Sequence, residues 1–83
     1  MKNRIAYMQD TDGAHLGFVK DGTHYTVLYY TARDYAEARV SAKKMFENQA
    51  EAAKVYLKIA GWMLLGAYSH ENRQDYLLTG TME

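Results

Sequence analysis

The chain contains no cysteine and no proline. Without cysteine it forms no disulfides, and it lacks the thiolate ligands that most structural zinc sites use. Serine is scarce as well, occurring only at Ser41 and Ser69. Neither serine lies in the Gly-x-Ser-x-Gly context of a nucleophile elbow. These absences argue against several common kinds of catalytic and metal site.

A net charge and a long apolar run are also missing. Ten basic and ten acidic residues cancel, whereas phosphate binding favours a basic excess and imitation of DNA an acidic one. The most apolar stretch, 55–65, is interrupted by Lys58 and Gly61 and is too short to span a bilayer. The first residues lack the apolar run of a signal peptide. We therefore expect a cytoplasmic protein with no membrane partner, in the host cytoplasm if it is viral.

The length of 83 residues predicts a single domain, 1–83, because the chain is too short for two cores. With 48% hydrophobic and 13% aromatic residues, the composition is that of a globular protein. A core of this size supplies a net stability of roughly 3–5 kcal/mol. Small domains without disulfides or metals often gain stability from a partner or from self-association.

The first thirty residues predict a three-stranded antiparallel meander over 4–9, 14–20 and 23–30. Asp12-Gly13 and Asp21-Gly22 separate these runs, and Asp-Gly is a strong hairpin signal. If both turns are two-residue loops, Phe18 lies opposite Tyr25 and Tyr7. One face then carries the predicted core, which is Ile5, Tyr7, Leu16, Phe18, Tyr25, Val27 and Tyr29.

The segment after the meander predicts helices that pack on this sheet. Thr31 has the properties of an N-cap, and apolar residues follow it at helical spacing through Phe46. Asn48 resembles a second N-cap, so the helix is predicted to be long or broken. Two alternatives remain beyond it: strands at 62–69 and 74–79, or a helix to Leu65 capped by Gly66, with a last strand at 76–79. The second is favoured. The predicted fold class is α+β, with one or two C-terminal strands.

Residues with catalytic potential do not converge in this layout. The predicted register separates His15 and His24 by roughly 13 Å, and His70 lies in a polar segment. Asp10 and Asp12 lack the further ligands of a calcium loop, and turn formation explains them without an ion. We therefore expect no enzyme activity, no catalytic residues, no metal site and no cofactor.

The reverse face of the predicted sheet is unusually apolar for a solvated surface. Met8, Val19, His24, Leu28 and Tyr30 lie on it in the predicted register, with no charged residue among them. This composition is typical of the centre of a protein interface. Three occupants remain open: a partner protein, a second copy that would form a homodimer, or the C-terminal segment 68–78.

A nucleic-acid or nucleotide site is the alternative function. In this hypothesis Tyr25 and Tyr29 stack on bases, while Arg39, Lys43 and Lys44 on the predicted helix contact phosphates. The same tyrosines are needed for the core if helices cover that face. The zero net charge also favours the protein-binding hypothesis over this one.

The passage from the meander, Tyr29-Tyr30-Thr31-Ala32, into Asp34-Tyr35-Ala36-Glu37-Ala38 resembles the layout of small phage-encoded inhibitors of the anti-CRISPR type. The resemblance covers about half of the chain and concerns architecture and size. It implies a viral, non-catalytic inhibitor or regulator that blocks a host defence complex sterically. It identifies no functional residue, because those proteins share no diagnostic motif with this chain.

Overall fold

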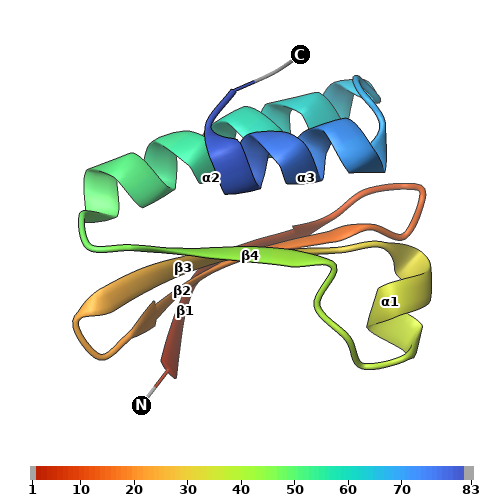
Figure 1. Cartoon of the computed structure of the whole chain (residues 1–83). Helices are drawn as coiled ribbons and strands as arrows, with labels where there is room; N and C mark the ends of the chain where they lie inside the picture. The colour runs from red at the N-terminus through yellow and green to blue at the C-terminus, as the bar shows by residue number, and fades with distance from the viewer. Residues whose placement is uncertain (1, 82–83) are drawn as a thin grey trace.

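The computed structural model describes residues 2–81 as one antiparallel sheet with helices packed against it (Figure 1). The elements in chain order are β1 (Lys2–Gln9), β2 (His15–Asp21), β3 (His24–Tyr30), α1 (Ala32–Ala36), β4 (Ala42–Phe46), α2 (Gln49–Leu65) and α3 (His70–Thr79). The strands lie side by side in the order β1-β2-β3-β4. The predicted α+β class and the three-stranded meander are confirmed. In the described part of the chain, no helix is long and apolar enough to cross a membrane.

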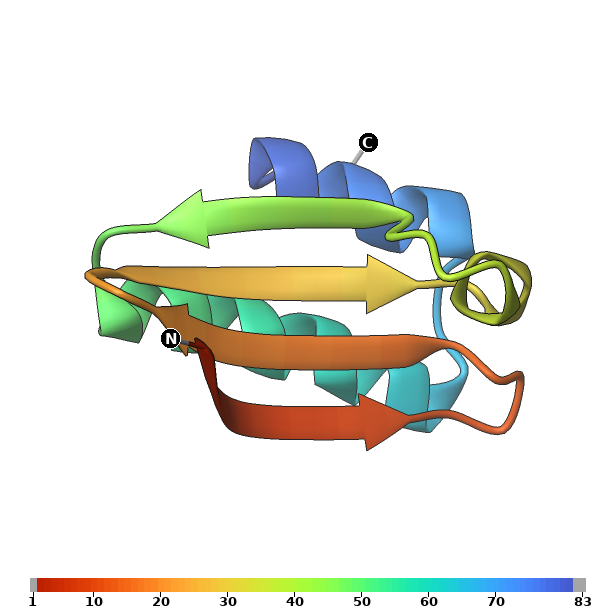
Figure 2. The ribbon, with the colours of Figure 1, turned by 90° about the horizontal axis from the view of Figure 1, so that it is seen from below.

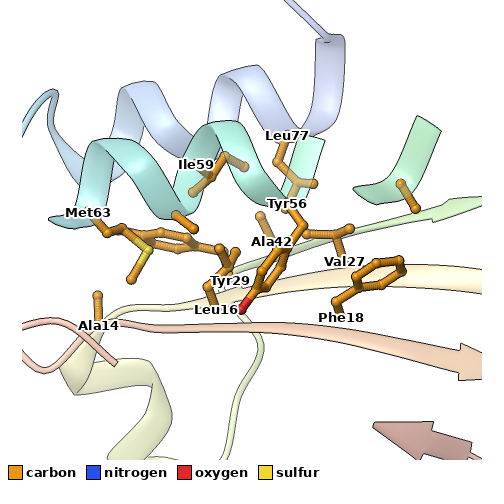
Figure 3. Packing of buried hydrophobic residues seen from close by; sticks show 12 residues of the cluster. Ala14, Leu16, Phe18, Val27, Tyr29, Ala42, Tyr56, Ile59, Met63 and Leu77 are labelled. Carbon is orange, nitrogen blue, oxygen red and sulfur yellow. The ribbon is translucent and has the colours of Figure 1, made fainter. Parts of the chain in front are cut away.

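The molecule has two layers, with α2 and α3 on one face of the sheet and α1 at one end of it (Figures 1 and 2). The core fills the space between the layers, and its largest fully buried side chains are Tyr29, Leu16, Ile59, Leu77 and Val27 (Figure 3). Neither long helix lies over the opposite face of the sheet. The fold therefore leaves one broad sheet surface for solvent or a partner.

The hairpin between β2 and β3 differs from the predicted one by a shift of two residues. Asp21 pairs with His24, which leaves Gly22 and Thr23 as the loop, and Phe18 pairs with Val27. Gly22 has a φ of 65°, as this tight turn requires. Because side chains alternate with a period of two, an even shift keeps every residue on its predicted face.

Strand β1 has the predicted direction, but the side chains of 6–9 point to the opposite faces of the sheet from those predicted. The loop before β2 has five residues, because Gln9 pairs with His15. The Asp10 carboxylate stabilises it by accepting hydrogen bonds from the backbone N–H groups of Asp12 and Ala14, at 2.9 Å each. This odd-numbered change of register turns Met8 towards the helices and Tyr7 away from them. The predictions that placed Met8 on the reverse face and Tyr7 in the core are therefore wrong.

A β-bulge between Arg4 and Ala6 further separates β1 from its expected geometry. Ala6 packs against the core, while Ile5 stays 41% exposed. Ile5 was predicted in the core, and this prediction is also wrong. A bulge inserts one extra residue into a strand and changes the direction of the side chains on either side of it.

The helix predicted from Thr31 through Phe46 is much shorter in the structure. The Thr31 hydroxyl accepts the Asp34 N–H as an N-cap, but α1 ends at Ala36 and the chain returns to the sheet as β4. In β4, Ala42 and Phe46 face the core, while Met45 faces outward. This segment has apolar residues at both helical and strand spacing, and pairing with β3 determines which is formed.

Two helices, α2 and α3, make up most of the C-terminal part of the chain that the structure describes. Helix α2 runs to Leu65 and ends at Gly66 with a φ of 66°, which confirms the favoured alternative. The last strand predicted at 76–79 is wrong, because α3 occupies this segment. The Ser69 hydroxyl accepts the Asn72 N–H at the start of α3, and Leu77 is fully buried against the core.

Replacing Ala38 with glycine is expected to stabilise the protein. Ala38 has a φ of 57°, a left-handed conformation that costs an L-residue about 1–2 kcal/mol, part of which is offset by the greater entropy of glycine when unfolded. We expect a gain of about 0.5–1 kcal/mol in the free energy of unfolding, measured by urea denaturation. The matched change Ala53→Gly in α2 should instead lower it. A loss of stability with Ala38→Gly would contradict the strain argument.

Candidate interaction surface

The face of the sheet away from α2 and α3 is called the open face. Its residues are Arg4 and Tyr7 of β1, His15, Gly17 and Val19 of β2, Thr26, Leu28 and Tyr30 of β3, and Lys43 and Met45 of β4. Val19, Leu28 and Tyr30 lie where the sequence predicts them. His24 lies at the hairpin end of β3, outside the hollow part of this face.

A groove runs across the open face towards α1. Arg4, Tyr7, Gly17, Val19, Leu28, Tyr30, Tyr35, Ala38 and Val40 line it. Gly17 has no side chain, so it leaves a depression between its apolar neighbours Val19 and Leu28. A second, smaller hollow continues beside Leu28 towards Met45. The surface is thus concave and largely apolar at its centre.

His15 is the centre of an aromatic cluster at one end of the groove. Its ring is stacked on Tyr35 with a centroid distance of 3.6 Å, and Tyr30 meets it edge-on at 6.5 Å. The Tyr7 hydroxyl forms a hydrogen bond with His15 Nδ1. His15 is only 6% exposed, whereas Tyr7 and Tyr35 are 40% and 52% exposed. The histidine therefore holds two partly exposed tyrosines in fixed positions.

The short helix α1 brings Tyr35 onto the open face, and a polar network fixes the segment that follows it. Asp34 accepts hydrogen bonds from the Ser41 hydroxyl at 2.6 Å and from the Arg39 guanidinium at 3.0 Å. The Ser41 hydroxyl in turn accepts the Thr31 N–H at 2.9 Å. This network ties both ends of the α1 segment together, so Tyr35 does not depend on a free loop for its position.

The Asp34 network predicts a pH-dependent contribution to stability. The Ser41 hydrogen bond and the Arg39 charge lower the pKa of Asp34 in the folded protein. This contribution is present above the ordinary aspartate pKa of about 3.9 and is lost as the pH falls through the lowered value. Asp34→Asn should therefore destabilise the protein most at neutral pH, and its difference from the wild type should shrink in acid. A difference that is constant with pH, in urea denaturation, would contradict the network.

Charged groups lie mainly at the margins of the open face. The Arg4 guanidinium lies over the Tyr7 ring, 4.8 Å from its centroid. Lys43 and Asp21 flank the smaller hollow. A cation on each side with an apolar centre is the usual arrangement of a protein interface, in which a polar rim surrounds a dry core.

The cations predicted to contact phosphates do not form one site. Arg39 lies after α1 and pairs with Asp34 and Glu37. Lys43 and Lys44 belong to β4 and not to a helix, so their side chains point to opposite faces of the sheet. The helical placement of these residues was wrong, because the segment forms a strand.

The tyrosines predicted to stack on bases belong to the core side of the sheet. Tyr29 is fully buried, and Tyr25 is half-buried against the core cluster. Tyr29 has no exposed surface for a base to stack on. The predicted stacking of a base on Tyr29 is therefore wrong, while Tyr25 keeps part of its surface exposed.

A buried polar network lies on the helix side of the sheet. Arg73, only 2% exposed, donates two hydrogen bonds to the Ala67 carbonyl and one to the Tyr29 hydroxyl, and it pairs with Asp10 at 3.4 Å. His70 Nδ1 lies 2.5 Å from the same Tyr29 hydroxyl. Burial raises the pKa of Tyr29 above its ordinary value. Each group has a partner within the protein, so we infer that this network stabilises the packing of α3 against the sheet.

Within residues 2–81, no three histidine or acidic side chains come together as a metal site. His15 and His70 lie on opposite faces of the sheet and bond to different tyrosines.

Sequence reasoning missed five residues that line the groove: Arg4, Tyr7, Tyr35, Ala38 and Val40. The five-residue loop before β2 exchanges the faces of 6–9, and the bulge at Ile5 then places Arg4 on the same face as Tyr7; neither is visible in the hairpin signal of Asp12-Gly13. Tyr35 and Val40 were obscured by the expected helix. The Thr31 cap was a correct signal for a helix start, but the sequence has no clear mark of its end.

No protein-family model, curated protein or solved structure matches this chain.

Proposed function

We propose that this protein is a non-catalytic binding module that docks a partner protein on the open face. The groove across that face is the observation that carries the proposal. Its centre is formed by Gly17, Val19 and Leu28, and partly exposed tyrosines stand at one end. Tyrosine and arginine with few other charges are the residues enriched at the centres of protein interfaces.

The rigidity of the surface supports this proposal. Three of the tyrosine rings on or beside the face are held in place by contacts with His15, and the α1 segment is fixed by hydrogen bonds. A preformed surface loses little side-chain entropy on binding, so more of the contact energy remains as affinity. Tyr35 is thus suited to be an anchor that inserts into a pocket of the partner.

The partner class that we propose is a protein of a host defence complex, blocked sterically by the bound module in the host cytoplasm. The support for this part is the resemblance in size and layout to small phage inhibitors of the anti-CRISPR type. A chain of 83 residues with one rigid face is sufficient for blockade, because steric occlusion needs affinity and volume but no chemistry.

A single-stranded nucleic acid is the second candidate, favoured by one observation. Tyr7, Tyr30 and Tyr35 gather on an open antiparallel sheet with Arg4 beside them. Aromatic residues on such sheets stack on bases, each contributing about 1–3 kcal/mol. The two hypotheses differ in salt dependence, since phosphate contacts weaken steeply with salt and an apolar interface does not.

The proposal is tested by affinity capture of the tagged protein from a lysate of its native host, with and without nuclease. A stoichiometric protein that survives nuclease and high salt is the expected result. Leu28→Asp should weaken this capture by about 100-fold or more, because it places a charge in the centre of the groove.

Leu65→Glu is the matched control. It also replaces an exposed leucine by an acid, but it lies on α2, and Leu65 is 82% exposed on the helix side of the molecule. Capture unaffected by Leu28→Asp, or recovery of nucleic acid alone, would exclude the proposed protein site.

A further inference from the structure

The outer edge of β1 is unpaired. In the sheet order β1-β2-β3-β4, β1 has a partner on one side only, and neither long helix covers its outer edge (Figure 2). Between Asn3 and Gln9 the only charged side chain is Arg4. Proteins usually protect an exposed edge with several charges or a proline, because free N–H and C=O groups are a template for another strand. The bulge at Ile5 disrupts only the first half of β1, and 6–9 pair regularly with β2.

The flank of α2 on the same side of the molecule is apolar and exposed. Trp62 contacts Tyr76 of α3, so the opposite flank of α2 is directed towards the β1 side. With 100° between successive residues, Leu57 and Leu64 lie on that opposite flank. They are 66% and 78% exposed. In a monomer, these two leucine side chains contact water and do not add to the buried core.

Edge and flank lie on the same side of the molecule and are here together called the edge wall, which consists of 5–9 of β1 and Leu57 and Leu64 of α2. Ile5 is 41% exposed at its lower margin, and Ala6 and Met8 are only partly covered by the helix layer. A partner for this surface must offer both a free strand and an apolar helix flank at the matching height.

We propose that the occupant of the edge wall is a second copy of this chain, related by a two-fold axis. The two β1 strands pair antiparallel through 6–9, which joins the sheets into one of eight strands. Leu57 and Leu64 of each copy then lie over the seam and cover the inner side of the joined sheet. A two-fold axis makes the interface self-complementary, so one surface supplies both the strand and the flank.

Charge fits this occupant, and size fits a weak dimer. The edge wall spans five strand residues at about 3.3 Å each, or roughly 17 Å, and the molecule is 18 Å across in its shortest dimension, so each copy offers roughly 300 Å². Two such walls bury roughly 600 Å², which is the size of a weak, reversible interface. In an antiparallel pair the Arg4 end of one β1 meets the other copy's loop that carries Asp12, so opposite charges lie close and the two Arg4 side chains lie far apart.

The dimer leaves both open faces free and places them side by side on one continuous sheet. The dimer therefore does not depend on the proposed function. If the open face does bind a partner, the dimer carries two such binding faces. A bivalent module engages a partner with repeated subunits more tightly than either face does alone.

Sedimentation equilibrium of the full chain, over concentrations from micromolar to millimolar, tests this proposal. We expect a reversible dimer. The double variant Leu57→Glu with Leu64→Glu should weaken dimerisation by about 100-fold, because four leucines leave the interface of the dimer. Circular dichroism checks that each variant is folded, and Leu64→Glu alone is the fallback if the double variant is not.

Two controls distinguish this surface from the others. Leu65→Glu changes the neighbouring leucine, which points away from the wall, and should leave the dimer intact. Leu28→Asp alters the open face and should also leave it intact, so failure of the binding proposal and failure of the dimer are separable. A chain that stays monomeric at millimolar concentration overturns the proposal. A dimer that survives Leu57→Glu with Leu64→Glu, or that is lost in Leu28→Asp, also overturns it.

Discussion

Replacing Arg73 with leucine is expected to destabilise the protein by about 3–5 kcal/mol, as measured by urea denaturation. The Asp10 side chain is 6% exposed, and the Arg73 guanidinium is the cation paired with it. Its removal leaves a buried carboxylate without a counter-charge and the Ala67 carbonyl without its two Arg73 donors, and it takes one hydrogen bond from the Tyr29 hydroxyl. A core of this size supplies a net stability of only roughly 3–5 kcal/mol, so most of it would be lost.

A double-mutant cycle separates the charge from the packing. Asp10→Asn removes the charge while its remaining amide oxygen still accepts the N–H groups of Asp12 and Ala14, as Asp10 Oδ1 does. We therefore expect Asp10→Asn to recover part of the stability lost in Arg73→Leu, which gives a coupling energy above about 1 kcal/mol. If the two substitutions change the free energy of unfolding additively, Arg73 stabilises the protein through its packing and not through its ion pair with Asp10.

The second large effect is a contrast between neighbouring residues of β3. Val27 is fully buried in the core, with 0% of its surface accessible to solvent, whereas Leu28 lies in the groove of the open face. Val27→Asp should abolish folding, because an unpaired carboxylate in this core costs several kcal/mol. Leu28→Asp introduces the same group one position along the strand and should leave a folded protein.

Thermal unfolding and circular dichroism of the two variants measure this contrast. The expected result is a cooperative transition for Leu28→Asp and none for Val27→Asp. If both variants unfold, some segment covers the open face and the face is a second core. If both fold, the assignment of the two faces of the sheet is wrong.

The sequence predicts the parts of this fold in which local signals are strong and agree. The caps at Thr31 and Asn48 and the end of α2 at Gly66 each have a specific hydrogen-bonding or backbone role, and all three are found. The faces of β2 and β3 are also correct, even though their hairpin is displaced by two residues. Because side chains alternate between the two faces with a period of two, an error of two residues in the register leaves each residue on its predicted face.

The sequence fails where long-range pairing decides between local alternatives. Ala42–Phe46 fits a helix as well as a strand, and only its contact with β3 makes it β4. The face of residues 6–9 of β1 depends on the five-residue loop before β2, which shifts the register by one residue. Val19, Leu28 and Tyr30 lie on the predicted face, but Met8 leaves it and Tyr7 joins it for this reason.

The C-terminal segment illustrates a tertiary determinant that periodicity does not reveal. Tyr76 to Thr79 has the side chains of a short strand, yet it continues the helix that Ser69 begins. Arg73 and Leu77, one helical turn apart, are both buried against the sheet. A buried arginine finds its partners, Asp10 and Tyr29, more than forty residues away, so no local pattern predicts it.

The measurement that tests the central claim most directly is tyrosine footprinting of the captured complex by mass spectrometry. Tyr35 and Tyr68 are equally exposed in the free protein, at 52% each, but Tyr35 borders the open face and Tyr68 follows α2 on the helix side. If the open face binds the partner, Tyr35 is protected from modification in the complex while Tyr68 still reacts. Protection of Tyr68 with Tyr35 still reactive would contradict the account and place the partner on the helices.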